Sequence, residues 1–285
     1  MAGKESASTS TIPVADENGL SGRTRTGGST ARNYAIAAAG EFLGTFLFFS
    51  TAYIATQAAK NSAATSSSSE SVALLLYISL AFALSLTANV WLFYRVSGGL
   101  FNPALTLAFV ALRLMTPAKG LLLAASQLLA GIAAAGVAKA LVPDYRLAVR
   151  TTLGAGVTPA QGFFIELFLT AELALAVFMI AVEKHRATHL APLVIGAALG
   201  VGHLVSASLT GASMNPARSF GPAVVDADFS GGHWVYWIAP CVGAVAAAGV
   251  YKCLLAVDYR TANPGQDADG VEEKGTVFID PTGSD

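Results

Sequence analysis

The chain has 285 residues, of which 54% are hydrophobic and 12% are charged, and its mean hydropathy is +0.57. Soluble domains carry about 25% charged residues, so this composition predicts a protein immersed in a lipid bilayer and excludes an ordinary soluble domain. The net charge of −1 gives no indication of nucleic-acid binding, and we expect no nucleic-acid partner.

The start of the chain, residues 1–33, is polar and rich in Ser, Thr and Gly. It has no apolar stretch after a basic start, which argues against a cleaved signal peptide. The other end, residues 257–285, is polar and acidic. We expect both to be solvated tails that flank a membrane domain at residues 34–256.

Six stretches are apolar and long enough to cross a bilayer core, which needs about 20 residues per helix. They are residues 34–57, 71–94, 118–141, 161–182, 190–209 and 233–256. Between them we expect a polar loop at 58–70, an irregular segment at 142–158 and a short charged turn at 183–189.

The distribution of Lys and Arg predicts the orientation, because cytoplasmic loops carry an excess of these residues. Six spans place both termini on one side. Of the 17 Lys and Arg residues, only five lie elsewhere, namely Lys60, Lys139, Arg146, Arg150 and Arg218. We therefore expect both termini in the cytoplasm, and we place the protein in the plasma membrane.

Two further apolar segments, roughly 96–115 and 210–228, are too short and too interrupted to span the bilayer. Irregular backbone at membrane depth persists only where protein buries it or where it lines a wet cavity, so both segments are predicted to be re-entrant. Three spans and one re-entrant segment thus occur twice, at about 34–141 and 161–256, and three spans per half require opposite orientations. The predicted fold is an all-α membrane protein, with six transmembrane helices and two re-entrant half-helices in an inverted repeat and its site at the midplane.

Both re-entrant segments contain the same tripeptide, once as Asn102, Pro103 and Ala104 and once as Asn215, Pro216 and Ala217. Asn is a favoured N-cap and Pro is favoured at the first helical position, so each copy predicts the start of a short helix. Inverted symmetry brings the two starts together, where their partial positive charges repel cations and the Asn amides offer hydrogen bonds. An ordinary capped turn is the alternative for one copy, but two copies at matching positions favour a functional junction.

Four ionisable residues within the apolar segments need an explanation. Arg218 follows the second tripeptide, and a cation within a bilayer marks a functional site by default; we favour a side chain that faces a water-filled lumen over a buried ion pair. Glu41 and Glu166 stand at matching points of the two halves, and we expect them to accept hydrogen bonds from the re-entrant loops. Glu172 is a further acid to which the sequence assigns no role, and a satisfied buried carboxyl is one interpretation of it.

With the doubled Asn-Pro-Ala and Arg218 after the second copy, residues 34–256 resemble the aquaporin, or major intrinsic protein, family, and fungal-type orthodox water channels in particular. The resemblance implies a homotetramer with one pore per protomer. It also implies a narrow filter of four residues: Phe82, His203, Ala212 and Arg218. We expect Phe82 and His203 to face each other across the lumen beside Arg218, with room for a single water molecule between them.

The resulting functional prediction is a passive water channel that conducts in single file, excludes ions and protons, and has water as permeant and the lipid bilayer as surroundings. It is not an enzyme, and we expect no catalytic residue, cofactor or metal. A glycerol or small-solute facilitator is the first rival function, disfavoured by Phe82, His203 and Ser219, because glycerol-conducting relatives usually carry Asp after the Arg. Two rivals from different classes are a secondary transporter on the same inverted repeat and a structural membrane protein with a closed pore.

Overall fold

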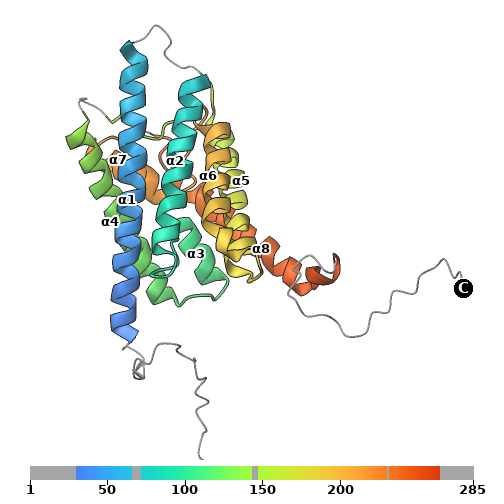
Figure 1. Ribbon diagram of the computed structural model, residues 1–285. Coiled ribbons are helices and arrows are strands. Elements are labelled where there is room, and N and C mark those ends of the chain that lie inside the picture. Colours follow the sequence, from blue (N-terminus) through green and yellow to red (C-terminus); the bar gives the residue numbers. More distant parts are fainter. Residues whose placement is uncertain (1–29, 66–71, 143–146, 230, 264–285) are drawn as a thin grey trace, which may run out of the picture.

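The computed structural model describes residues 30–65, 72–142, 147–229 and 231–263, and those ranges form a bundle of helices (Figure 1). Within the described residues there is no strand, so the prediction of an all-α protein is confirmed. Most of the two predicted tails, 1–33 and 257–285, lies outside the described residues.

Six helices are long and apolar enough to cross a membrane, as the sequence predicts. They are α1 (Thr30–Thr65), α2 (Val72–Phe93), α4 (Pro117–Leu141), α5 (Pro159–Val177) together with the turn that follows it, α6 (Ala191–Ser206) together with the turn that precedes it, and α8 (Val235–Ala256). A π-helical turn, η1 (Phe178–Val182), extends α5, and short 3₁₀ turns, η2 (Thr188–Leu190) and η3 (Tyr259–Thr261), precede α6 and follow α8.

The first helix is longer than predicted. It continues to Thr65, through most of the 58–70 segment for which we expected a polar loop. That segment contains several Ala residues and one Lys, which are strong helix formers, and it also forms a tertiary contact. Lys60 donates from Nζ to the Ala148 carbonyl at 2.7 Å, so the extra turns are joined to the loop that follows α4.

Two short helices, α3 (Pro103–Ala111) and α7 (Pro216–Val225), occupy the segments predicted to be re-entrant. They lie at different heights of the bundle, α3 toward the end where α1 begins and α7 toward the end where α1 finishes (Figure 1). In the first half α1 packs against α2 and α4, and in the second half α5 packs against α6 and α8 in the same pattern. Each short helix packs against the third span of the other half, α7 on α4 and α3 on α8, which interlocks the halves.

Small residues allow the closest helix crossings, as is common in membranes. A Cβ atom on Gly221 of α7 would lie 2.2 Å from the Gly131 carbonyl oxygen of α4, and one on Gly196 of α6 would lie 1.8 Å from Thr87 Oγ1 of α2. Backbone meets backbone or a short side chain at both crossings, so only glycine fits.

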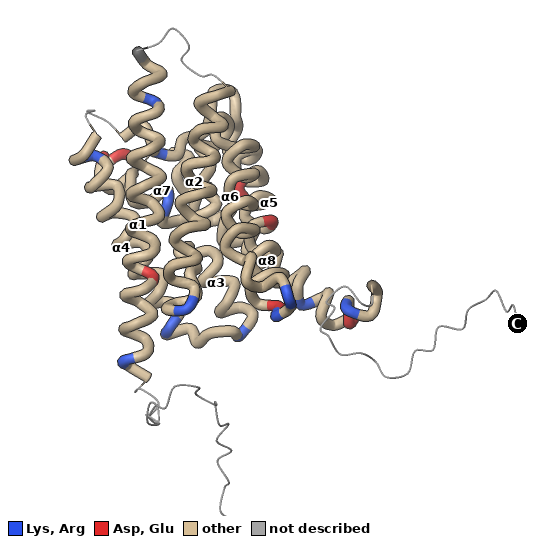
Figure 2. Tube along the Cα trace, viewed as in Figure 1, with Lys and Arg blue, Asp and Glu red and all other residues tan. Residues whose placement is uncertain are grey.

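Figure 2 shows most Lys and Arg residues near the end of the bundle where α1 begins, and few acids within the spans. Glu41 and Glu166 are fully buried. Glu172, in contrast, is exposed on α5, so the interpretation of a satisfied buried carboxyl is wrong for the single chain.

Candidate functional site

Both short helices begin in the middle of the protein at an Asn-Pro pair. The Asn102 side chain accepts a hydrogen bond from the Ala104 N–H at 2.9 Å, and the Asn215 side chain accepts one from the Ala217 N–H at 2.9 Å. Both Asn residues have extended backbone and the following Pro occupies the first helical turn, so local capping places each helix start.

The two Asn residues also join the halves of the chain. Asn102 Nδ2 donates to the Met214 carbonyl at 2.8 Å, and Asn215 Nδ2 donates to the Phe101 carbonyl at 2.8 Å. Phe101 and Met214 each stand directly before an Asn and adopt φ angles of 50° and 51°, a left-handed backbone that side chains rarely adopt. This reciprocal pair fixes the two helix starts against each other, and each Asn amide retains a second N–H.

A buried carboxylate holds the loop before each helix start. Glu41 accepts hydrogen bonds from the N–H groups of Leu100 and Phe101, at 3.1 and 2.7 Å, and from Gln127 Nε2 at 2.8 Å. These bonds compensate for burial of the charge, because a buried carboxylate without partners is very costly.

Glu166 holds the second loop by the same arrangement. It accepts from the N–H groups of Ser213 and Met214, at 2.9 and 2.6 Å, and from Thr210 Oγ1 at 2.5 Å. The structure thus places both acids against the re-entrant loops. The third hydrogen-bond donor is the Gln127 amide for Glu41 and the Thr210 hydroxyl for Glu166.

Arg218 is buried and bonded to backbone carbonyls. Its Nε donates to the Ala212 carbonyl at 3.0 Å, its Nη2 donates to the Gly211 carbonyl at 3.3 Å, and its Nη1 donates to the Val149 carbonyl. None of the ion pairs among the described residues includes Arg218, so the structure does not show the buried ion pair that we considered. A guanidinium has five N–H groups, so two remain beyond these three bonds.

Phe82 and His203 lie beside Arg218, but not across a lumen from each other. Their rings are stacked with centroids 4.1 Å apart, and the Arg218 Cζ lies 5.0 Å from the Phe82 centroid. The expected gap for a water molecule between the two rings is therefore wrong. The close α2–α6 crossing at Gly196 brings the rings into contact, so any passage runs alongside the pair.

Only one ring nitrogen of His203 faces away from the protein backbone. Nδ1 lies 3.0 Å from the Leu199 carbonyl, which can only accept, so Nδ1 carries the hydrogen. Nε2 is buried and has no partner among the described residues. Of the two ring nitrogens, only Nε2 is therefore left to bond a permeant.

The fourth predicted filter residue, Ala212, contributes its backbone. It is fully buried, has a φ of 53°, and is not among the residues that line the cavity described below. Its carbonyl holds Arg218 Nε.

A cavity of about 380 Å³ connects these groups. At one end it is lined by Phe82, His203 and Arg218, and both Asn102 and Asn215 contribute to its wall. At the other end it reaches Tyr94 and Lys184, whose side chains are joined by a 3.0 Å hydrogen bond from Lys184 Nζ to the Tyr94 hydroxyl. Most of the remaining lining is apolar and includes Leu100, Leu105 and Leu199. The predicted junction and filter thus share one elongated space.

Sequence reasoning missed several groups around this cavity. The Tyr53 hydroxyl donates to the Arg218 carbonyl at 2.7 Å, and Gln127 joins Glu41 to Thr106. A polar residue within an apolar span is a signal that identifies Gln127. The Val149 carbonyl has no such signal, because any residue supplies one.

The described residues contain no group of three or more His, Cys, Asp or Glu side chains that could hold a metal ion.

Comparison with known proteins gives one consistent family. A family model described as Major intrinsic protein matches residues 29–251. Aquaporin-1 of Gibberella zeae is 48% identical over 246 residues, which cover 86% of this chain and 77% of that protein. Aquaporin-7 of Botryotinia fuckeliana is 46% identical over 255 residues, which cover 88% of this chain but only 55% of that protein, so the chain spans about half of its length.

Among solved structures, the X-ray structure of the aquaglyceroporin from Plasmodium falciparum matches with a TM-score of 0.68. The match covers 79% of this chain and 99% of that chain at 22% sequence identity. At this identity the likeness shows the fold alone.

Proposed function

This chain belongs to the major intrinsic protein family, whose members are channels rather than enzymes, and we propose that it conducts water passively in single file while excluding ions and protons. The observation that carries the proposal is the reciprocal Asn102–Asn215 junction on the wall of a cavity that Arg218 bounds.

The junction suits the passage of a neutral molecule. Each Asn uses one amide hydrogen on the opposite loop and keeps the second for a permeant. Two donors at the same level bind the oxygen of one water, whose hydrogens then point away along the channel. That water cannot accept a proton from a neighbour, and the partial positive charges of both helix starts oppose cations.

Water rather than glycerol is the proposed permeant. Phe82 presents an apolar ring at the level of Arg218, and His203 offers one free nitrogen, so few partners serve a polyol's hydroxyls. Ser219, which follows Arg218, bonds inward to Ser213 Oγ at 2.5 Å. A glycerol or small-solute facilitator remains the alternative, and the comparison of water with glycerol permeability below separates the two.

Both termini are proposed to be cytoplasmic, in a plasma-membrane protein. Support comes from the cluster of Lys and Arg near the end of the bundle where α1 begins (Figure 2).

We further propose a homotetramer that covers the outer face of α5. Glu172 is exposed there, near the middle of a span that runs from Pro159 to Val182. A carboxylate facing lipid at that depth is costly, so contact with a second copy of the chain explains its position.

Stopped-flow light scattering on proteoliposomes, with water and glycerol gradients compared, tests the channel proposal. We expect water permeability far above that of empty liposomes, low glycerol permeability and an activation energy near that of free water diffusion. Saturable flux with a high activation energy would support a transporter instead. Permeability equal to empty liposomes would support a structural protein.

A further inference from the structure

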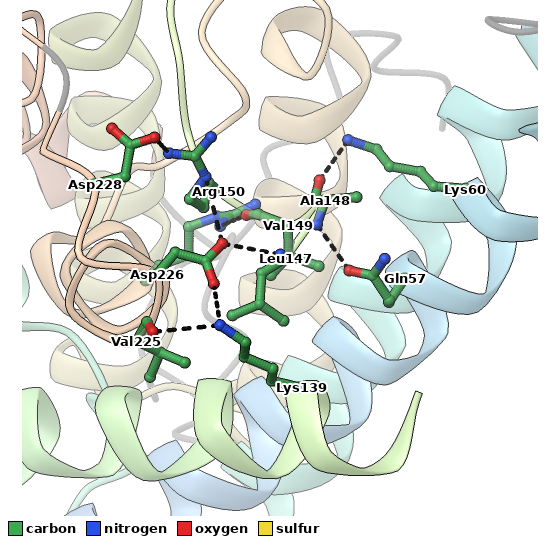
Figure 3. A network of polar contacts seen from close by, with 11 residues as sticks. Gln57, Lys60, Lys139, Leu147, Ala148, Val149, Arg150, Val225, Asp226 and Asp228 are labelled. Atoms are coloured by element: carbon green, nitrogen blue, oxygen red, sulfur yellow. Dashed lines mark hydrogen bonds and ion pairs between the residues drawn. The ribbon is translucent and has the colours of Figure 1, made fainter. Parts of the chain in front are cut away.

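A tight turn after α4 links the first helix to the predicted filter. In the turn Leu147–Arg150, the Arg150 N–H donates to the Leu147 carbonyl at 3.4 Å. From α1, Gln57 Oε1 accepts from the Ala148 N–H at 2.8 Å, and Lys60 Nζ donates to the Ala148 carbonyl at 2.7 Å (Figure 3). The next carbonyl, that of Val149, accepts from Arg218 Nη1. The orientation of one peptide group therefore decides whether Arg218 has its third partner.

A single carboxylate holds the opposite side of this turn. Asp226, the residue directly after α7, accepts from the Leu147 N–H at 2.9 Å through Oδ2 and from Lys139 Nζ at 2.8 Å through Oδ1 (Figure 3). Arg150 Nε lies 3.7 Å from the same Oδ2. The Asp226 side chain is only 6% exposed, so these contacts are largely shielded from water.

The charge of Asp226 persists at neutral pH. Burial by itself raises the pKa of this carboxyl, but the hydrogen bonds from Lys139 and from the Leu147 N–H outweigh burial and hold the pKa below its ordinary value. Charge-assisted hydrogen bonds of this kind are roughly twice as strong as neutral ones, so the carboxylate is a strong anchor.

The position of Asp226 in the chain makes the anchor specific. Helix α7 carries Arg218 in its first turns and ends at Val225, directly before Asp226. Both ends of this short helix therefore bond to the same turn. Arg218 donates to the Val149 carbonyl, and Asp226 accepts from the Leu147 N–H. Without Asp226, the Leu147 N–H loses its partner, and the turn is held by the α1 contacts of Ala148, by the Arg150–Asp228 ion pair and by its buried Leu147 and Val149 side chains. None of these remaining contacts bonds the Leu147 N–H, so the orientation of the turn is less well fixed.

We propose that Asp226 is a positioning residue for selectivity, which fixes the Leu147–Arg150 turn so that the Val149 carbonyl holds the Arg218 guanidinium in place. The inference rests on the proposed function, because it assigns Arg218 to the filter of a water channel. If Arg218 loses this partner, its guanidinium is no longer held in one position. The opening between Arg218 and Phe82 then varies in size and no longer admits water alone.

The test compares Asp226→Ala and Asp226→Asn with a matched control, Asp228→Asn. Asp228 is an exposed acid two residues further on that pairs with Arg150 but does not bond the backbone of the turn. Folding and assembly are checked by size-exclusion chromatography, and glycerol and water permeabilities are measured in proteoliposomes. We expect the glycerol-to-water ratio to rise about three- to tenfold in Asp226→Ala, less in Asp226→Asn, and not at all in Asp228→Asn.

A double-variant cycle separates positioning from general stability. If Asp226 acts through Arg218, adding Asp226→Ala to an Arg218→Val variant leaves that variant's permeability ratio unchanged. Equal effects of Asp226→Ala in both backgrounds, or an unchanged ratio in a folded Asp226→Ala protein, would overturn the proposal.

Two further results complete the design. If Asp226→Ala does not assemble, Asp226→Asn is compared with Lys139→Gln, which removes the partner of Asp226 Oδ1. A changed glycerol-to-water permeability ratio in either variant supports the proposal. An unchanged ratio in both variants refutes it. A wild type that conducts no water refutes the proposed function itself, whereas a selective wild type with unchanged Asp226 variants refutes only this inference.

Discussion

Replacing Phe82 and His203 together with Ala is expected to admit glycerol while water still passes. The two rings are stacked 4.1 Å apart and form one wall of the cavity beside Arg218. A glycerol hydroxyl that passes them meets an apolar ring face and, apart from His203 Nε2 and the remaining Arg218 N–H groups, finds no partner there. The double substitution removes this wall and leaves space that water can fill.

The cost of an unpaired hydroxyl sets the size of the expected effect. A buried hydroxyl without a partner costs about 1–3 kcal/mol. Since about 1.4 kcal/mol of barrier changes a rate tenfold, hydrating one such hydroxyl raises glycerol permeability about 5- to 150-fold. Proton leakage is expected to stay low, because Arg218 and both helix starts are unchanged.

The assay is glycerol uptake by proteoliposomes, followed by light scattering, with a pH-sensitive dye for protons. Phe178→Ala is the matched control, because Phe178 is fully buried and does not line the cavity. It removes the same ring and is expected to leave glycerol permeability low. If the double variant assembles correctly and its glycerol permeability is as low as that of the wild type, this placement of the filter is refuted.

Three further outcomes are expected. Mercurials should inhibit water flux only weakly, because Cys241 is half-buried and Cys253 exposed, and neither lines the cavity; strong, thiol-reversible block would contradict this. Glu166→Gln should lower the thermal unfolding midpoint, because the new amide group faces three hydrogen-bond donors and leaves at least one of them unpaired, which costs about 1–3 kcal/mol. An unchanged midpoint in differential scanning fluorimetry would contradict this. Burial raises the pKa of the Glu183 carboxyl, but hydrogen bonds from Tyr251 and Arg260 outweigh burial and hold the pKa below its ordinary value. The Glu183–Arg260 pair should therefore stabilise the segment after α8 at neutral pH and lose this effect as the pH falls through the lowered pKa of Glu183, seen as increased mobility of a spin label at residue 262. Mobility independent of pH would contradict it.

The features that can be predicted from the order of residues are those that depend on near neighbours in the chain. Apolar length predicts the six spans, and the Asn-Pro pairs at 102 and 215 predict two helix starts, because capping involves only residues within one turn. Glu41, Glu166 and Arg218 stand out for a related reason, since an ionisable side chain within an apolar span requires partners. A sequence therefore shows that such a side chain needs a partner, although it does not show which group the partner is.

The partners of those residues follow from the packing of segments that are distant in the chain. The helical extension of α1 to Thr65 brings Lys60 to the Ala148 carbonyl, and the crossing at Gly196 brings Phe82 against His203, which removed the expected gap between the rings. Arg218 is held by carbonyl oxygens, including that of Val149, and Asp226 acts on a backbone N–H. Every residue except proline carries both backbone groups, so no residue type marks such a contact, and only the packing of distant segments places it.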